Sequence, residues 1–171
     1  MQLNYFIIPL LTILTAVTGS VITSRGMSWY KTIIRPGFTP PGSIIGAIWT
    51  IIFILSASSL LIVWNSAYVS TAINMTSGQI ITAVNSAERN VVVLVFIFNA
   101  ILNVLWSWLF FSQQRMLIAF YEALVLDLTV VVLIILIWPA SIIAAMLLLP
   151  YAIWGAFASF LTYRIWRLNL S

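Results

Sequence analysis

Aromatic rings and amides recur at helical spacing in two apolar stretches of the chain. Asn99, Asn103 and Trp106 stand at i, i+4 and i+7, so one face of a helix would carry all three. Trp49 and Phe53 stand at i and i+4 in an earlier stretch. Amides form directional hydrogen bonds, and large rings stack on flat apolar molecules. The pattern predicts a binding face for a planar small molecule, with cross-linking of helices by the asparagines as the alternative.

A third apolar stretch repeats this composition directly after Pro150. Tyr151, Trp154 and Ala158 stand at i, i+3 and i+7 and therefore share a helix face. Three such faces could enclose an apolar pocket with a few amide and phenol groups, which is the usual composition of a small-molecule site. The alternative is an aromatic core without a ligand.

Two acids lie in one further apolar stretch. Glu122 and Asp127 are five residues apart, which turns a helix by about 140°, so they cannot share a face as a catalytic pair would. Glu122 is less than two turns from Arg115, so it could pair with Arg115 or with loop donors. Asp127 lies deeper, where we expect it to be protonated or hydrogen-bonded.

The elements that position these residues are membrane-spanning helices. The chain of 171 residues is 63% hydrophobic and 6% charged, which is too little polar surface for a water-soluble globule. A span needs roughly 20 apolar residues. The sequence therefore predicts an all-α membrane protein, a single domain over 1–171 that forms a five-helix transmembrane bundle with helices at about 5–23, 43–64, 90–111, 116–138 and 141–163.

The basic residues predict the orientation of the bundle. One side of the membrane would carry six of the seven: Arg25, Lys31, Arg35, Arg115, Arg164 and Arg167. Arg89 alone falls on the other side. By the positive-inside rule the C-terminus is cytoplasmic and the N-terminus is outside. Scattered in this way, the charges form no patch for nucleic acid.

The chain has no cysteine and no histidine. Thiolate nucleophiles, histidine bases and the usual zinc, copper and haem ligands are thereby excluded, so we predict no metal site and no obligatory cofactor.

Two connections between the helices are informative. Pro36, Pro40 and Pro41 would stiffen the first loop without hydrogen bonds. The polar loop over 65–90 is expected to carry a short amphipathic helix ending near Glu88, and Asn74 begins a glycosylation sequon.

Small residues at four-residue spacing favour close helix packing and make an oligomer plausible. They are Gly42/Gly46, Ala152/Ala156 and Gly155/Ser159.

Four ordered blocks resemble the TspO/MBR family, the tryptophan-rich sensory proteins that include the translocator protein or peripheral benzodiazepine receptor. The blocks are "WY" at 29–30, "RPGFTPPGSIIGAIWT" at 35–50, "NAILNVLWSWLFF" at 99–111 and "LPYAIWGAFASFLTYRIWRLN" at 149–169. The resemblance departs at Glu122, where the family usually has Asp, and at Thr162, where Asn is frequent.

The resemblance implies a five-helix bundle, commonly a homodimer, that binds protoporphyrin IX and related tetrapyrroles, with sterols or synthetic ligands in some members. Its pocket would lie beneath the first loop. Carried over by motif, the site residues are Tyr30 and Pro40 in the lid and Trp49, Phe53, Asn99, Asn103, Trp154 and Ala158 on the helices.

Three functional hypotheses follow. The first is a tetrapyrrole-binding sensor, scavenger or carrier without enzymatic activity. The second is light- and oxygen-dependent degradation of bound porphyrin, with Trp49 or Trp154 as the redox-active residue. The third is a small transporter of hydrophobic ligands or sterols, coupled to protons through Asp127 or Glu122. We expect a prokaryotic plasma membrane rather than the outer mitochondrial membrane.

Overall fold

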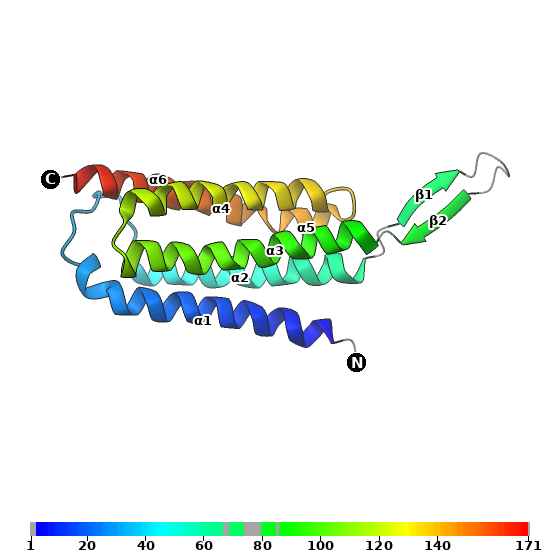
Figure 1. The fold of residues 1–171 in the computed structure, drawn as a ribbon, viewed down its shortest axis with the longest axis horizontal. Helices are drawn as coiled ribbons and strands as arrows, with labels where there is room; N and C mark the ends of the chain where they lie inside the picture. Colours follow the sequence, from blue (N-terminus) through cyan, green and yellow to red (C-terminus); the bar gives the residue numbers. More distant parts are fainter. Residues whose placement is uncertain (1–2, 67–68, 74–79, 85, 171) are drawn as a thin grey trace.

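The chain folds into a bundle of membrane-length helices. The computed structural model describes residues 3–66, 69–73, 80–84 and 86–170. These residues include five helical spans that are long and apolar enough to cross a membrane, as the composition predicts. The elements, in chain order (Figure 1), are α1 (Asn4–Tyr30), α2 (Gly42–Asn65), β1 (Val69–Ile73), β2 (Ile80–Val84), α3 (Ser86–Ser107), the π-helix η1 (Trp108–Ser112), α4 (Met116–Ile137), α5 (Ile142–Met146) and α6 (Leu149–Leu168).

The first helix continues two turns beyond the predicted boundary at residue 23 and ends at Tyr30. Its last turns pack on η1, where Gly26 contacts the backbone of Phe111. The rings of Trp29 and Phe110 meet edge to face at 5.6 Å, and Tyr30 lies 5.6 Å from the ring of Phe111. These tertiary contacts stabilise a helical extension that has little hydrophobic periodicity of its own.

The last predicted helix is interrupted. Residues 141–163 were expected to form one helix, but α5 ends at Met146 and α6 begins at Leu149 and runs to Leu168. Pro150 stands in the first turn of α6, where its missing N–H removes no helical hydrogen bond, whereas in the middle of a continuous helix it would remove one.

A β-hairpin replaces the amphipathic helix expected before Glu88. β1 and β2 pair antiparallel with Val69 opposite Val84, and α3 begins directly afterwards at Ser86. The two strands read VSTAI and IITAV, so β-branched residues dominate both, and these favour strands over helices. The sequon at Asn74 lies outside the described residues.

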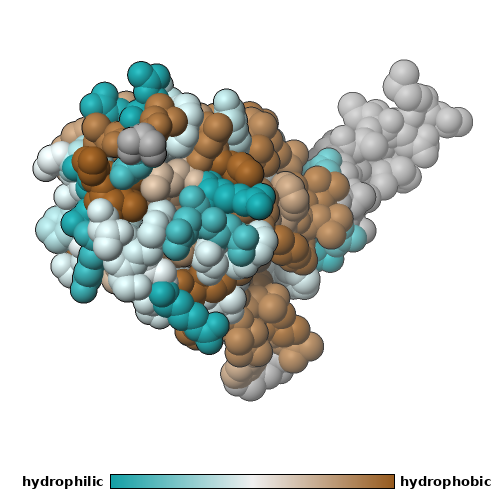
Figure 2. Space-filling model, turned by 60° about the vertical axis from the view of Figure 1, so that its left-hand side comes forward, coloured by the Kyte–Doolittle hydropathy of each residue, from teal (hydrophilic) through white to brown (hydrophobic). Residues whose placement is uncertain are grey.

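The two ends of the bundle differ. The N-terminus and the hairpin lie at one end, and the α1–α2 loop and the C-terminus lie at the other (Figure 1). Figure 2 turns the second end forward and shows hydrophilic residues gathered on it, with hydrophobic residues along the flank. An odd number of spans places the termini at opposite ends.

Candidate functional site

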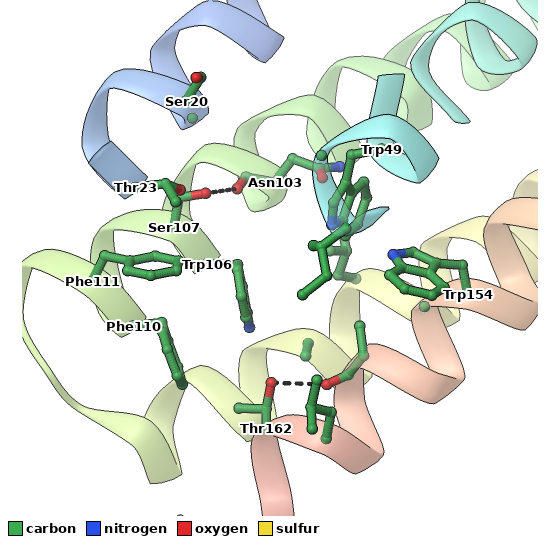
Figure 3. A pocket seen from close by; sticks show the side chains of 18 of the residues that line it. Ser20, Thr23, Trp49, Asn103, Trp106, Ser107, Phe110, Phe111, Trp154 and Thr162 are labelled. Atoms are coloured by element: carbon green, nitrogen blue, oxygen red, sulfur yellow. Dashed lines mark hydrogen bonds between the residues drawn. The ribbon is translucent and has the colours of Figure 1, made fainter. Parts of the chain in front are cut away.

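A cavity of about 470 Å³ opens between the helices near the end that carries the α1–α2 loop. Side chains from α1, α2, α3, η1, α4 and α6 line it (Figure 3). Seven of the ten predicted ligand-binding residues are among them: Tyr30, Trp49, Phe53, Asn103, Trp106, Trp154 and Ala158. The three ring-bearing stripes therefore converge on one cavity.

The rings of this cavity are held in place by other rings. Trp106 stacks on Phe110 with centroids 5.2 Å apart and planes 10° from parallel. Trp49 meets the ring of Tyr151 edge to face at 5.8 Å. Such contacts hold these rings in defined orientations along the cavity wall.

Two of the remaining predicted residues, Asn99 and Tyr151, lie behind the cavity wall and not in its lining. Both are buried. The Tyr151 hydroxyl donates to Asn99 Oδ1 at 3.1 Å, and Asn99 Nδ2 donates to Thr129 Oγ1 at 2.8 Å. Asn103 Nδ2 also donates to the Tyr151 hydroxyl. This polar network cross-links α3, α4 and α6, which is the structural role weighed above for the asparagines.

The tenth residue, Pro40, also lies outside the lining. It precedes Pro41, the N-cap residue of α2, in a loop that is attached to α6. Ile34 N–H donates to Asn169 Oδ1 at 3.0 Å, and Asn169 Nδ2 donates to the Ile34 carbonyl at 2.9 Å. Phe38 stacks on Phe160 at 5.9 Å. Tyr30 and Gly42 are the lining residues at the two ends of this loop.

Asp127 belongs to the cavity, although the sequence analysis did not include it among the ligand-binding residues. Ser159 on α6 donates a hydrogen bond to Asp127 Oδ2 at 2.6 Å. A Cβ atom built on Gly155 would lie 2.1 Å from Asp127 Oδ1, so any other residue at 155 would displace the carboxylate from this position. The small pair Gly155/Ser159 therefore serves contact between α4 and α6 of one chain, and it offers no support for a dimer.

The predicted pairing of Glu122 with Arg115 or with loop donors is wrong. Glu122 is 8% exposed, and neither of its carboxylate oxygens has a hydrogen-bond partner within the described residues. Arg115 is exposed at the start of α4, about 10 Å along the helix from Glu122. The arginine side chain remains at the end of the bundle while the acid is turned into the protein.

One wall of the cavity comes from α1, of which only Tyr30, at its C-terminal end, is a predicted site residue. Thr15, Gly19 and Thr23 line it at four-residue spacing, and Ser20 and Met27 join them. The stripe of small and hydroxyl residues at i, i+4 and i+8 was the available signal. It has no rings, so it does not share the aromatic pattern of the other three faces.

One buried hydrogen-bond donor at the cavity has no partner among the described residues. The indole Nε1 of Trp154 is buried and has no hydrogen-bond acceptor within the described residues. Buried donors in native proteins are nearly always paired, so this one calls for an explanation. A polar group on a bound molecule could accept from it after a small rotation of the ring.

Comparison with known proteins finds one family and relatives named TspO or translocator protein. The TspO/MBR family matches residues 7–167. The tryptophan-rich protein TspO of Bacillus cereus is 29% identical over 169 residues, which cover 99% of each chain. The protein of the same name from Archaeoglobus fulgidus is 32% identical over 152 residues, covering 88% of this chain and 87% of that one. The human translocator protein is 23% identical over 155 residues, covering 90% and 82%.

Proposed function

The chain belongs to the TspO/MBR family, and from that premise we propose that it binds tetrapyrroles within the membrane, with protoporphyrin IX as the ligand. It would act as a sensor, scavenger or carrier in porphyrin and stress metabolism.

The observation that carries this proposal is the aromatic cavity. Its volume of about 470 Å³ lies within the range of roughly 300–1,000 Å³ typical of small-molecule sites. Trp49, Trp106 and Trp154 line it together with Phe53 and Phe110. A flat macrocycle would gain burial of apolar surface and ring stacking there. The buried indole N–H of Trp154 could donate to a polar edge of the ligand once the ring has turned toward the cavity.

The charges near the cavity favour one orientation of a porphyrin. Lys31 and Arg35 lie in the α1–α2 loop next to Tyr30, and the Arg35 guanidinium sits 5.0 Å from the centroid of the Tyr30 ring. Asp127 lies in the lining farther along the bundle. Ligand propionates would be attracted toward the loop and repelled by Asp127. The two loop cations also serve as ordinary membrane anchors.

We further propose that the protein resides in a prokaryotic plasma membrane with the α1–α2 loop and C-terminus in the cytoplasm. The basic residues at that end support this orientation. A homodimer is proposed from family likeness alone.

The test is a dark titration of protoporphyrin IX into the protein in nanodiscs, followed by quenching of tryptophan fluorescence. We expect saturable binding by the wild type and binding weaker by about tenfold or more in Trp49→Ala/Trp154→Ala, since two ring contacts are lost. Trp138→Ala is the matched control because Trp138 is 49% exposed and lies outside the described lining. Absence of saturable binding, or equal binding by the double variant, would refute the proposal.

A second candidate is light-dependent degradation of the bound porphyrin with dioxygen as the oxidant. The observation in its favour is that two indoles, Trp49 and Trp154, line the same cavity. Illumination of the complex in air should then bleach the porphyrin, whereas darkness or removal of oxygen should not. Equal bleaching in the wild type and in Trp49→Phe/Trp154→Phe would exclude a redox role for these residues.

A further inference from the structure

The cavity contains one acid among many rings. Asp127 projects from α4 into the lining, and the described lining residues include no lysine or arginine. Its Oδ2 accepts the 2.6 Å hydrogen bond from Ser159. Its Oδ1 has no hydrogen-bond donor among the described residues. One half of the carboxylate is therefore anchored and the other half is free.

The free oxygen is held at the cavity by Gly155. Oδ1 lies where the side chain of any other residue at 155 would begin, with 2.1 Å to the position of a Cβ atom. Asp127, Gly155 and Ser159 all belong to the lining, and Asp127 is only partly buried. Two residues one turn apart on α6 thus place an acceptor on the wall of the cavity.

A carboxylate in apolar surroundings discriminates strongly between ligand groups. Hydrogen bonds to a charged acceptor are roughly twice as strong as neutral ones, and low polarity increases the electrostatic part. A ligand ammonium or N–H group would therefore be stabilised beside Oδ1. A ligand carboxylate at the same place would meet a like charge and lose its own hydration.

We propose that Asp127, oriented by Ser159, is a specificity-determining residue that recognises a nitrogen-bound hydrogen of the ligand. At the Asp127 end, the cavity selects planar apolar molecules that present a protonated amine or a peripheral N–H group over the same ring systems presenting a carboxylate there, so the propionates of a porphyrin would lie away from Asp127. This inference rests on the proposed function, since it requires that the cavity bind planar molecules. It adds the chemical class of the group that the cavity prefers.

The experiment compares three fluorescent probes with one ring system. Aminomethylpyrene carries an ammonium group at neutral pH, hydroxymethylpyrene carries a neutral hydroxyl, and carboxypyrene carries a carboxylate. Each is titrated into the full chain in nanodiscs of zwitterionic phosphatidylcholine, and binding is followed by energy transfer from protein tryptophan to pyrene. Empty nanodiscs correct for partition of each probe into lipid.

Three variants locate the preference. Asp127→Asn keeps the shape of the side chain and removes its charge. Glu122→Gln makes the same change on the same helix at a buried acid outside the described lining, and it is the matched control. Ser159→Ala removes the anchor and leaves the charge in place.

In the wild type we expect the ammonium probe to bind at least tenfold more tightly than the hydroxyl probe, and the carboxylate probe to bind most weakly. Asp127→Asn should reduce the affinity for the ammonium probe by about tenfold or more and the affinity for the hydroxyl probe by a clearly smaller factor, so the preference for ammonium narrows. Glu122→Gln should behave as wild type, and Ser159→Ala should reduce the preference by a smaller factor.

Equal binding of the ammonium and carboxylate probes to the wild type would overturn the inference without any variant. A preference that persists in Asp127→Asn, or disappears equally in Glu122→Gln, would overturn it too. Protoporphyrin IX is titrated into the same samples, so a cavity that binds the porphyrin but does not distinguish the probes would refute this inference and leave the proposed function in place.

Discussion

Replacing Gly155 by alanine tests the close approach of α4 and α6 at the cavity. The added Cβ would lie 2.1 Å from Asp127 Oδ1 and 3.1 Å from its Cγ, whereas ordinary van der Waals contact begins at 3.4 Å. The carboxylate would therefore have to move by about 1.3 Å. Such a movement breaks the 2.6 Å hydrogen bond from Ser159.

The magnitude follows from these contacts. Overpacking costs about 1–3 kcal/mol, and loss of a hydrogen bond to a charged group costs about 1.5–3 kcal/mol. The alanine regains up to about 1 kcal/mol of helix propensity. Because the clashing oxygen is the free end of a side chain that can rotate, overpacking stays at the low end of its range, and we expect a net destabilisation of about 1–3 kcal/mol, which lowers the melting temperature by about 2 °C or more for a chain of this length. Thermal unfolding in detergent, followed by circular dichroism and tryptophan fluorescence, measures it.

Gly46→Ala is the matched control, because a Cβ at that helical glycine in α2 would meet no atom within 4 Å. It should leave the melting temperature unchanged or raise it slightly. The double variant Gly155→Ala/Asp127→Ala removes the clashing carboxylate and should recover much of the lost stability. The effects of the two substitutions on the free energy of unfolding would then not add, which shows that the two side chains interact. If Gly155→Ala melts at the same temperature as Gly46→Ala, the geometry argued for Asp127 is refuted.

Three further predictions concern other parts of the bundle. Gly26→Ala places a Cβ atom 2.5 Å from the Phe111 carbonyl oxygen, which is a backbone atom and cannot rotate away. This variant should therefore lower the melting temperature by at least as much as Gly155→Ala, and an unchanged melting temperature would show that α1 does not pack this closely on Phe111. Asn169→Ala removes both hydrogen bonds between Asn169 and Ile34 and should speed amide hydrogen exchange in the α1–α2 loop. Unchanged exchange would show that other contacts hold the loop. Glu122→Met replaces a buried carboxyl that has no partner among the described residues and should raise the melting temperature by a few degrees, whereas a decrease would indicate a bonding partner for the acid.

The residues of the aromatic stripes could be predicted from local periodicity. Trp49 and Phe53 on α2, and Trp154 and Ala158 on α6, line one cavity because a helix face that is rich in rings and small residues packs inward. Whether those faces would enclose a cavity or a solid aromatic core could not be decided in this way. That outcome depends on the distances between helices, which no single stripe contains.

The polar residues show where local pattern stops being informative. Asn99 and Asn103 share one stripe, yet Asn99 bonds with Tyr151 and Thr129 behind the wall while Asn103 reaches the lining. Glu122 and Asp127 share one helix, yet Asp127 meets a serine on α6 and Glu122 meets no partner in the described part of the chain. These pairings join residues about 30 to 50 positions apart, so they exist only once the helices have packed.

The sequence by itself determined that the protein spans a membrane five times, because hydrocarbon requires helices of about 20 apolar residues and the chain contains five such stretches. It also determined which faces of three helices carry rings, since side-chain direction repeats with the helical period. Only the tertiary structure decided that α1 closes the cavity with small residues, that Gly155 admits Asp127, and that the loop over 65–90 contains a hairpin. The first two depend on packing between segments distant along the chain. The hairpin depends on backbone hydrogen bonds between two neighbouring strands.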